Sequence, residues 1–438
     1  MSADSWLSTT LGKVAEFGNG GAWNQDEYTA DGVRVVRVSD VKGDTLDLSE
    51  CKYLSMAALD RYRRHQLRTG DLIICTVGSH PTQPASVVGR AVVVPKFADG
   101  ALLNQNAVRV RPAVPHVHAG WLGFLGRSRR FHEYIIGCAG GAASQVRMPI
   151  GLLKEMPISV PPFSIQRRIS SILSAYDNLI ENNTRRIAIL EEMARRIYEE
   201  WFVRFRFPGH DGVRMVESEL GVMPEGWRTD VLAGVCEPKT GIQTGPFGSQ
   251  LHKADYSEVG VPVLMPKDLI GFRIVEDSVA RVPEATAESL KRHRMRPGDI
   301  AYGRRGDIGR RAFIMAHQTG WLCGTGCLRI RPDKKSINSW YVFNYLGQES
   351  VVGLIAGRAH GVTMPNLNAQ LLESVPVVCP PRELQDQFEQ ISFPMAELRE
   401  SLIAKNANLR TTRDLLLHKL ISGELGVSAM PEPEALAA

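Results

Sequence analysis

Two long segments of the chain place apolar side chains at alternating steps of three and four residues. After Leu173, the seam of the first segment consists of Tyr176, Ile180, Asn183, Ile187, Leu190, Ala194, Ile197 and Trp201. The seam of the second segment consists of Phe388, Ile391, Met395, Leu398, Leu402, Leu409 and Leu416, and it is diluted by Lys405, Thr412 and Lys419. This heptad spacing predicts two long helices that pair along their seams. The first helix, over residues 164–206, would be roughly 60 Å long.

The two predicted helices can pair within one chain if the intervening residues return the chain to the end where it left. We then expect an antiparallel pair in which Asn183 fixes the register at some cost in stability. Pro394 predicts a kink or a restart in the second helix, because proline lacks the backbone donor and clashes with the preceding turn. A coiled coil that only dimerises the protein remains an open alternative.

The regions before the two helices repeat each other. The segment "VPPFSIQRRI" (160–169) matches "CPPRELQDQF" (379–388), "RHQLRTGDLI" (64–73) matches "RHRMRPGDIA" (292–301), and "VRVRP" (108–112) matches "LRIRP" (328–332). A repeat of this length predicts a duplicated globular domain, each copy followed by one helix. Short β-rich runs broken by glycine and proline make each copy a mixed α/β domain.

The predicted fold class is therefore α/β, with two duplicated mixed α/β domains separated by two long antiparallel coiled-coil helices in a pseudo-twofold arrangement. The predicted boundaries are a first domain over 1–160, a spacer helix over 161–207, a second domain over 208–378, a second spacer helix over 379–424 and a flexible tail over 425–438. The Pro-Pro pairs end the last strand of each domain and start each helix.

Composition narrows the class of protein. The 438 residues carry a net charge of +5 and a pI of about 8.8, which favours a polyanionic partner. No apolar run is long enough to cross a membrane, so we expect a soluble, cytoplasmic protein. The seven cysteines are scattered and form no ligand pairs with histidine, so we predict no metal site.

Sequence motifs of catalysis are also missing. "VPPF" (160–163) resembles the Asp/Asn-Pro-Pro-aromatic loop of amino methyltransferases, but Val160 has no side-chain oxygen to accept a hydrogen bond from the substrate amine. "GIQTGPFGSQ" (241–250) is rich in glycine but lacks the Gly-Lys-Ser/Thr of a nucleotide-binding loop. We therefore predict neither a catalytic site nor a cofactor in this chain.

The order of these motifs identifies a family. "MPEGW" (223–227), "TGPFGSQL" (244–251), the two Gly-Asp motifs at 70–71 and 298–299, the paired Pro-Pro motifs and the two heptad helices closely resemble the specificity (S) subunit of Type I restriction-modification systems. The resemblance covers about residues 1–424. The chain departs from it at Pro394, in its weaker second seam, and at "SHPTQPAS" (79–86), which is an insertion relative to the second copy.

The resemblance implies that each domain is a target-recognition domain that reads one half of a split, asymmetric sequence in double-stranded DNA. The helices would space the halves and dock two methyltransferase (M) subunits, and restriction (R) subunits would join them. The chain itself would be a non-catalytic DNA-recognition subunit, with S-adenosylmethionine, ATP and Mg bound by partner subunits. Two other functions remain to be weighed: a coiled-coil scaffold without nucleic-acid specificity, and a stand-alone DNA-modifying enzyme, for which the motifs are absent.

Loops that combine amide and basic side chains are the candidates for DNA contact, because such groups form paired hydrogen bonds with base edges. In the first copy they are Gln25, Lys42, Ser79, His80, Thr82, Gln83, Asn104, Gln105, Asn106, Gln145 and Arg147. In the second copy they are Thr244, Ser249, Gln250, Lys253, Lys267, Arg304, Arg305, Asp307, Arg358, His360 and Thr363. The candidates for partner binding are Gln166, Arg167 and Gln385.

The basic runs differ in what they predict. The cluster at 303–311, "GRRGDIGRR", is the strongest candidate for DNA binding. "RYRRHQLR" (61–68) and its match "SLKRHRMR" (289–296) fit either phosphate contact or a solvated helix before a strand. The sequence does not separate these two readings.

Overall fold

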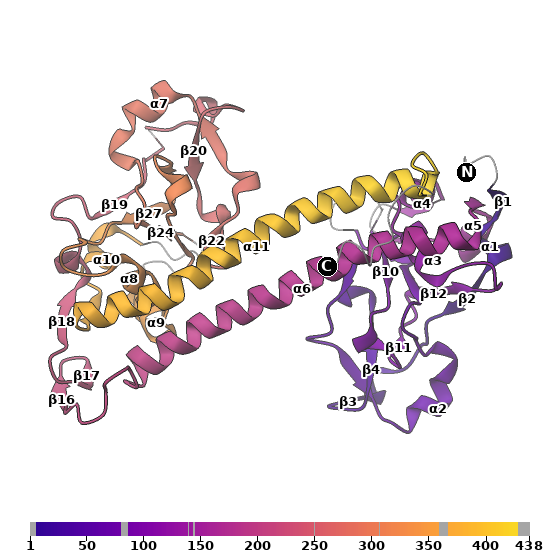
Figure 1. The fold of residues 1–438 in the computed structure, drawn as a ribbon, viewed down its shortest axis with the longest axis horizontal. Helices are drawn as coiled ribbons and strands as arrows, with labels where there is room; N and C mark the ends of the chain where they lie inside the picture. Colours follow the sequence, from indigo (N-terminus) through magenta and orange to yellow (C-terminus); the bar gives the residue numbers. More distant parts are fainter. Residues whose placement is uncertain are drawn as a thin grey trace. The chain divides into compact units, whose positions relative to one another are not determined.

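The computed structural model describes residues 6–79, 86–138, 140–142, 145–248, 250–305, 307–358 and 367–427; side chains are described for these residues except 140–142 and 145. The chain divides into two compact units (Figure 1). Unit 1 contains Met1–Arg185 and Leu402–Ala438, and unit 2 contains Arg186–Ser401. Each unit thus combines one of the two copies with part of each long helix. The domain boundaries expected from the sequence, which separate helices from domains, remain a prediction.

Unit 1 is a mixed α/β unit. Its strands are β1 (Leu7–Thr10), β2 (Ala15–Asn19), β3 (Tyr28–Thr29), β4 (Val33–Val36), β5 (Val41–Lys42), β6 (Thr45–Leu46), β7 (Lys52–Leu54), β8 (Leu72–Cys75), β9 (Val77–Gly78), β10 (Ala91–Val93), β11 (Leu102–Leu103), β12 (Ala107–Pro112), β13 (Gly140–Ala142), β14 (Gln145–Arg147) and β15 (Pro157–Val160). Its α-helices are α1 (Leu11–Val14), α2 (Ala58–Tyr62), α3 (Ala119–Gly126), α4 (Arg129–Cys138), α5 (Ile150–Glu155) and the first part of α6 (Phe163–Tyr198). Its 3₁₀ helices are η2 (Gln25–Glu27), η3 (Val38–Asp40), η4 (Arg63–His65) and η5 (Lys96–Ala98).

Unit 2 has the same class of structure. Its strands are β16 (Met215–Ser218), β17 (Gly221–Pro224), β18 (Arg228–Val231), β19 (Ile242–Thr244), β20 (Val261–Leu264), β21 (Leu269–Ile270), β22 (Arg273–Ile274), β23 (Ala280–Val282), β24 (Ile300–Gly303), β25 (Arg311–Phe313), β26 (Leu322–Cys323), β27 (Cys327–Ile330) and β28 (Pro376–Cys379). Its α-helices are α7 (Glu284–Ser289), α8 (Ser339–Tyr345), α9 (Glu349–Arg358), α10 (Ala369–Glu373) and the first part of α11 (Arg382–Ser422). A π-helical turn (Glu199–Val203) follows α6, and the 3₁₀ helices are η7 (Leu232–Val235), η8 (Lys253–Asp255), η9 (Pro266–Asp268), η10 (Glu276–Ser278), η11 (Lys291–His293) and η12 (Ala316–Gln318).

The two units share one sheet topology. The four-stranded sheet β10-β8-β12-β2 of unit 1 corresponds to β25-β24-β27-β19 of unit 2. A second sheet joins β11 in parallel to β4, as β26 joins β20, and a short antiparallel pair (β1–β15, β18–β28) precedes each long helix. The hairpins β5–β6 and β21–β22 also correspond. The predicted duplication of a mixed α/β domain is confirmed.

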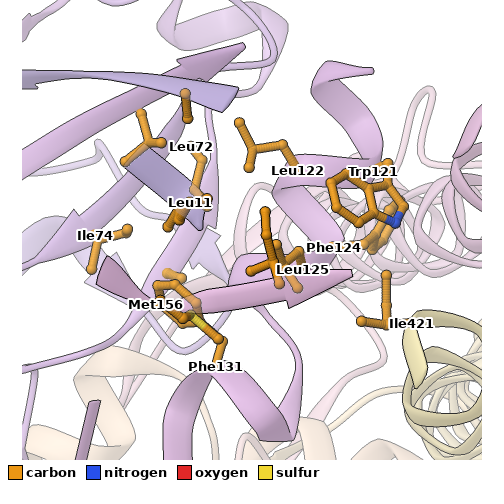
Figure 2. Packing of buried hydrophobic residues seen from close by; sticks show 14 of the residues in the cluster. Leu11, Leu72, Ile74, Trp121, Leu122, Phe124, Leu125, Phe131, Met156 and Ile421 are labelled. Atoms are coloured by element: carbon orange, nitrogen blue, oxygen red, sulfur yellow. The ribbon is translucent and has the colours of Figure 1, made fainter. Parts of the chain in front are cut away.

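Both long helices contribute to the core of unit 1. Ile169 and Leu173 of α6 and Leu420 and Ile421 of α11 are buried in the same cluster as Trp121. Figure 2 shows Ile421 with the labelled residues of this cluster. Beyond α11, Val427 is also buried there, so the described start of the predicted tail packs against unit 1. The helices are therefore structural parts of the domain core as well as connectors.

Unit 2 buries the other ends of the helices in an aromatic cluster. Tyr198 of α6 and Phe202 of the π-helical turn contact Phe388 of α11, with ring centroids 5.5 Å and 5.3 Å apart. Phe202 also packs edge-on against Tyr341 of α8 at 4.9 Å. Rings in such arrangements stabilise a core beyond the apolar area that they bury.

The predicted antiparallel pairing and seam of α6 are confirmed within each unit. In unit 1, Asn183 is buried and its Nδ2 donates to Oδ1 of Asn406 at 2.9 Å. Asp177, earlier in α6, pairs with Arg413, later in α11, at 2.7 Å, so the helices run in opposite directions. In unit 2, Glu191 pairs with Arg399 at 3.6 Å, whereas Tyr198, later in α6, contacts Phe388, earlier in α11, so the direction is the same. Asn183 therefore lies in the seam with a polar partner, as its predicted role in setting the register requires.

The predicted seam of α11 is wrong by about one residue at several positions. Ile391 and Leu398 are exposed, whereas the buried or largely buried positions at intervals of a heptad are Ser392, Arg399, Asn406, Arg413 and Leu420. Lys405, Thr412 and Lys419, which were expected to dilute the seam, lie outside it. Of the predicted kink or restart at Pro394, the restart does not occur, because α11 continues through this residue from Arg382 to Ser422, and the kink stays a prediction.

No helix in the described ranges is long and apolar enough to cross a membrane. The cysteines are all unpaired and, apart from the partly exposed Cys138, buried. Among the residues that the structure describes, no group of three or more His, Cys, Asp or Glu side chains is placed to hold a metal ion.

Candidate nucleic-acid interface

An aspartate–arginine ion pair lies at the start of the central strand, β8 or β24, in each unit. Asp71, from the first Gly-Asp motif, accepts from Arg111 Nη2 at 2.7 Å, and Asp299 accepts from Arg331 Nη2 at 2.7 Å. Burial alone would lower the pKa of Arg331, but its hydrogen bond and charge interaction with Asp299 raise it. The Gly-Asp motif and the "VRVRP" or "LRIRP" motif are therefore in contact in each unit. The ion pair connects the strand that follows Gly-Asp, β8 or β24, to its neighbour in the sheet, β12 or β27.

In unit 1, four segments meet at the loop Asn104–Asn106, which connects β11 to β12. The backbone N–H of Thr76 donates to the Asn106 carbonyl at 2.9 Å, and the N–H of Met148 donates to the Thr76 carbonyl at 2.8 Å. The N–H of Gly20 donates to the Ala107 carbonyl at 3.0 Å. A Cβ on Gly20 would lie 1.8 Å from the Asn104 carbonyl oxygen, so this close approach requires glycine.

Unit 2 builds the same junction from different side chains. The loop Gly324–Gly326 takes the place of Asn104–Asn106, and Arg304 takes the place of Thr76. The N–H of Arg304 donates to the Gly326 carbonyl at 2.8 Å, and the N–H of Leu367 donates to the Arg304 carbonyl at 2.9 Å. A Cβ on Gly245 would lie 2.0 Å from the Gly324 carbonyl oxygen, as for Gly20 in unit 1.

The Arg304 side chain lies at the surface of this junction. Its Nε donates to the Leu367 carbonyl at 2.7 Å, and its guanidinium lies 5.8 Å from the ring centroid of Phe247, which is 53% exposed. Partial burial and the charge of Arg305 lower the pKa of Arg304. An arginine that is held at one nitrogen and covered by an aromatic ring keeps its other N–H groups for a ligand.

The structure brings some of the predicted DNA-contacting residues together. In unit 1 these are Asn104, Gln105 and Asn106 in the loop, Ser79 after β9, and Arg147 in β14, which pairs with β9. In unit 2, Arg304 and Arg305 follow β24, Thr244 ends β19, and Gln250 lies near them: its Oε1 accepts from the N–H of Phe247 at 3.2 Å. We call these two groups the loop junctions.

Other predicted residues lie on separate elements. Gln25 is in η2, Lys42 in the β5–β6 hairpin and Lys253 in η8; all three are exposed. Lys267 donates to the Ser278 carbonyl at 3.4 Å, and Arg358 to the Ser374 carbonyl at 3.2 Å. Asp307 pairs with Arg310 at 3.0 Å. The remaining predicted positions fall outside the described residues or, for Gln145, the described side chains: His80, Thr82, Gln83, Gln145, Ser249, His360 and Thr363.

The predicted partner-binding role conflicts with the structure at both glutamines. Gln166 is fully buried: its Oε1 accepts from the His118 N–H at 2.7 Å, and its Nε2 donates to the carbonyls of His116 and Pro161 at 2.8 Å. Gln385 is 1% exposed and bonds in the same way. Its Oε1 accepts from the Asn338 N–H at 2.8 Å, and its Nε2 donates to the Pro380 carbonyl at 2.7 Å. These side chains fasten helices to domains, so of the three candidates only Arg167 presents an exposed side chain.

Two residues of the unit 2 loop junction were missed. Phe247 is an exposed aromatic in the middle of "TGPFGSQ", and Thr325 Oγ1 donates to the Pro246 carbonyl at 2.9 Å. An aromatic ring between a proline and a glycine was the available signal for Phe247. No local sequence signal indicates that Thr325 lies beside Pro246, because the two are brought together only by strand pairing.

Comparisons with known proteins agree with this architecture. Residues 4–192 match the family model described as "Type I restriction modification DNA specificity domain". The chain is 24% identical to the Type I restriction enzyme MjaIX specificity subunit of Methanocaldococcus jannaschii, over 71% of this chain and 70% of that one. It is 19% identical to the HindI specificity subunit of Haemophilus influenzae, over 87% of this chain and 93% of that one.

A solved structure shares the fold. The crystal structure of the S subunit of a Type I restriction-modification system from M. genitalium superposes with a TM-score of 0.63 at 15% identity, and covers 95% of this chain and 96% of that one. Over most of its length the chain thus resembles the specificity subunits of Type I restriction-modification systems, and residues 4–192 match the family model of their DNA specificity domain.

Proposed function

We propose that this chain is the DNA-sequence recognition subunit of a Type I restriction-modification complex, and that each unit reads one half of a bipartite, asymmetric target. One observation carries the proposal. The two loop junctions share a backbone frame but present different side chains: Asn104, Gln105 and Asn106 in unit 1, against Gly324, Thr325, Gly326 and Arg304 in unit 2. Equal frames with unequal side chains suit two readers of two different half-sites.

The proposed contacts follow from the chemistry of base edges. Asparagine and glutamine amides form paired hydrogen bonds with adenine, and arginine does so with guanine, at roughly 1–3 kcal/mol of discrimination for each good pair. Asn104, Gln105, Asn106, Arg304 and Arg305 are the residues of the loop junctions best suited to this task. The other residues predicted from the sequence remain proposed contacts of the surrounding loops.

The long helices would space the two half-sites and dock two methyltransferase subunits. Their seams are closed by contacts within each unit, and their outer faces carry exposed charged residues such as Arg167 and Arg185. In this proposal the restriction subunits join the same complex. S-adenosylmethionine, ATP and Mg would be bound by the partner subunits, and this chain would contribute recognition without catalysis.

The test is methylation by the full chain in complex with its methyltransferase subunit. Plasmid DNA methylated by this complex would be read by single-molecule sequencing. We expect a split motif with a fixed gap. Arg304→Thr, which installs the unit 1 residue, should relax one half of that motif by about 1–3 kcal/mol and leave the other half unchanged.

A matched control removes a charge at the far end of β27, the strand that pairs with β24. Lys335 is exposed beyond the last residue of β27, whereas the loop junction precedes the first residue of that strand. Lys335→Ala should leave both half-sites intact. A continuous motif in the wild type, or no methylation by an assembled complex, would contradict the proposed function.

A further inference from the structure

An arginine and a histidine, adjacent in sequence, occur at the same place in both units. Arg64 and His65 end η4, and Arg292 and His293 end η11. Each 3₁₀ helix precedes the Gly-Asp motif that leads into the central strand β8 or β24. The two basic segments therefore belong to the frame that the units share.

The histidine fixes the arginine side chain in each unit. Arg64 Nε donates to His65 Nε2 at 3.0 Å, and Arg292 Nε donates to His293 Nε2 at 2.9 Å. Both imidazoles are buried and both arginines are exposed. A ring nitrogen can accept a hydrogen bond only while it is unprotonated. Burial, with the charges of Arg292 and Arg329, lowers the pKa of His293 to about 4, which preserves the acceptor at neutral pH.

The backbone beneath these arginines is also fixed. Arg109 Nη1 donates to the Arg64 carbonyl at 3.2 Å, and Arg329 Nη1 donates to the Arg292 carbonyl at 2.8 Å. Arg109 and Arg329 lie in β12 and β27, the strands that begin at the loop junctions. In unit 2 the connection is closer, since Arg292 Nη2 also donates to Gln250 Oε1 at 3.3 Å. Each exposed guanidinium is thus attached to the same sheet as the proposed reading loops.

Several basic residues of the same two segments form ion pairs within the chain. Arg61 pairs with Glu27 at 3.4 Å, Lys291 with Glu288 at 3.5 Å and Arg296 with Glu237 at 3.9 Å, and Arg294 pairs with Glu284. In the part of the chain that the structure describes, no carboxylate lies within ion-pair distance of Arg64 or Arg292. Their equivalent positions combine a fixed side chain with an uncompensated charge.

We infer that Arg64 and Arg292 are equivalent contacts of the two units to the DNA phosphate backbone, each oriented by its neighbouring histidine. The inference rests on the proposed function and deepens it. Two different half-sites differ in their bases but share the same sugar-phosphate chain. Residues that are identical and identically held in both units therefore suit the phosphates, whereas residues that differ suit the bases. His65 and His293 act as positioning residues.

The experiment measures duplex affinity as a function of salt, with the full chain in its methyltransferase complex. Each lost phosphate contact reduces the magnitude of the negative slope of log K against log salt by about 0.9. Arg64→Ala and Arg292→Ala should each show that reduction, and the double variant about twice as much. The affinity for cognate and scrambled duplexes should fall by the same factor, so that their ratio is unchanged.

Two controls separate position from charge. Lys13→Ala removes an exposed charge beside the far end of β12, where Ala113 N–H donates to the Val14 carbonyl, and should leave the slope unchanged. His65→Gln and His293→Gln remove the imidazole that holds the arginine side chain and leave the arginine itself in place, and their effect should disappear when the arginine is already alanine.

Each result has one meaning. Wild-type slopes in both arginine variants would overturn the inference, and so would a loss confined to the cognate duplex, which would make these arginines base readers. If the wild-type complex itself binds cognate and scrambled duplexes equally, the proposed function fails instead. The unfolding temperature of each variant, measured alongside, identifies a loss that is due to misfolding.

Discussion

The two units differ most in the loops that would meet a ligand. They differ least in the internal contacts that stabilise the fold of each unit. Both keep a buried Asp–Arg pair, a buried glutamine at the start of a long helix and an Arg–His pair before the central strand. At the loop junction, by contrast, Thr76 is replaced by Arg304 and Asn104–Asn106 by Gly324–Gly326. One backbone frame thus supports two surfaces of different chemistry.

A second difference concerns the hairpins. In unit 1, Asp44 at the tip of β5–β6 pairs with Arg127 and Arg413, both at 2.9 Å. In unit 2, Phe272 at the tip of β21–β22 lies 4.5 Å from the guanidinium of the buried Arg311. Both tips contact an arginine, but one contact is an ion pair and the other a cation–π interaction. The units conserve the position of a contact and change its chemistry.

The largest expected effect tests whether the shared ion pair supports both units equally. Asp71→Ala and Asp299→Ala should each destabilise the protein by about 3–5 kcal/mol, because each leaves a largely buried arginine without its charge partner. Guanidinium chloride unfolding measures the loss. Asp307→Ala, which removes only the exposed pair with Arg310, should cost at most about 1 kcal/mol. A large loss at one aspartate alone would break the equivalence of the two frames.

A smaller effect should distinguish the two glutamines. Gln166→Ala and Gln385→Ala each leave buried backbone groups unpaired, at about 1–3 kcal/mol. Gln166 makes three hydrogen bonds and Gln385 two, so Gln166→Ala should be the more costly change. Urea unfolding provides the comparison, with the exposed Gln387→Ala as a neutral control. If Gln385→Ala costs as much as Gln166→Ala, the additional bond in unit 1 contributes no stability.

The smallest effect concerns pH and unit 2. The folded protein holds the pKa of His293 at about 4, whereas the unfolded chain protonates this residue near its ordinary pKa of about 6.5. Between these values the unfolded state binds more protons, so stability should fall as pH falls, by roughly 0.8 kcal/mol from pH 8 to pH 6. His293→Gln should remove this part of the pH dependence in thermal unfolding. Identical pH profiles for variant and wild type would show that His293 is not held neutral.

Sequence periodicity predicted α6 well because its seam is mostly apolar. It misplaced the seam of α11, where Asn406 and Arg413 occupy buried positions while Ile391 and Leu398 are exposed. A periodicity rule treats polar side chains as surface residues. It does not register that Asn183 and Asp177 on the other helix provide the partners that make their burial tolerable.

The same limit applies to the candidate site. Asn104–Asn106 and Arg304 were identified by residue type, and the fold places each at a loop junction. Gln166 and Gln385 were also identified by residue type, but they are buried because the Pro-Pro turn before each helix leaves backbone groups that a side-chain amide can satisfy. Whether an amide faces a ligand or the backbone depends on contacts from distant segments, which a single sequence does not display.

The burial of Leu420, Ile421 and Val427 in unit 1 has a consequence for biosynthesis. Unit 1 begins at the N-terminus, but part of its core is encoded after unit 2, which spans Arg186–Ser401. At 5–20 residues per second, a ribosome needs roughly 10–40 s to translate that interval. During this time the apolar cluster around Trp121 lacks these three side chains. The part of the protein that is synthesised first is therefore the last to be completed.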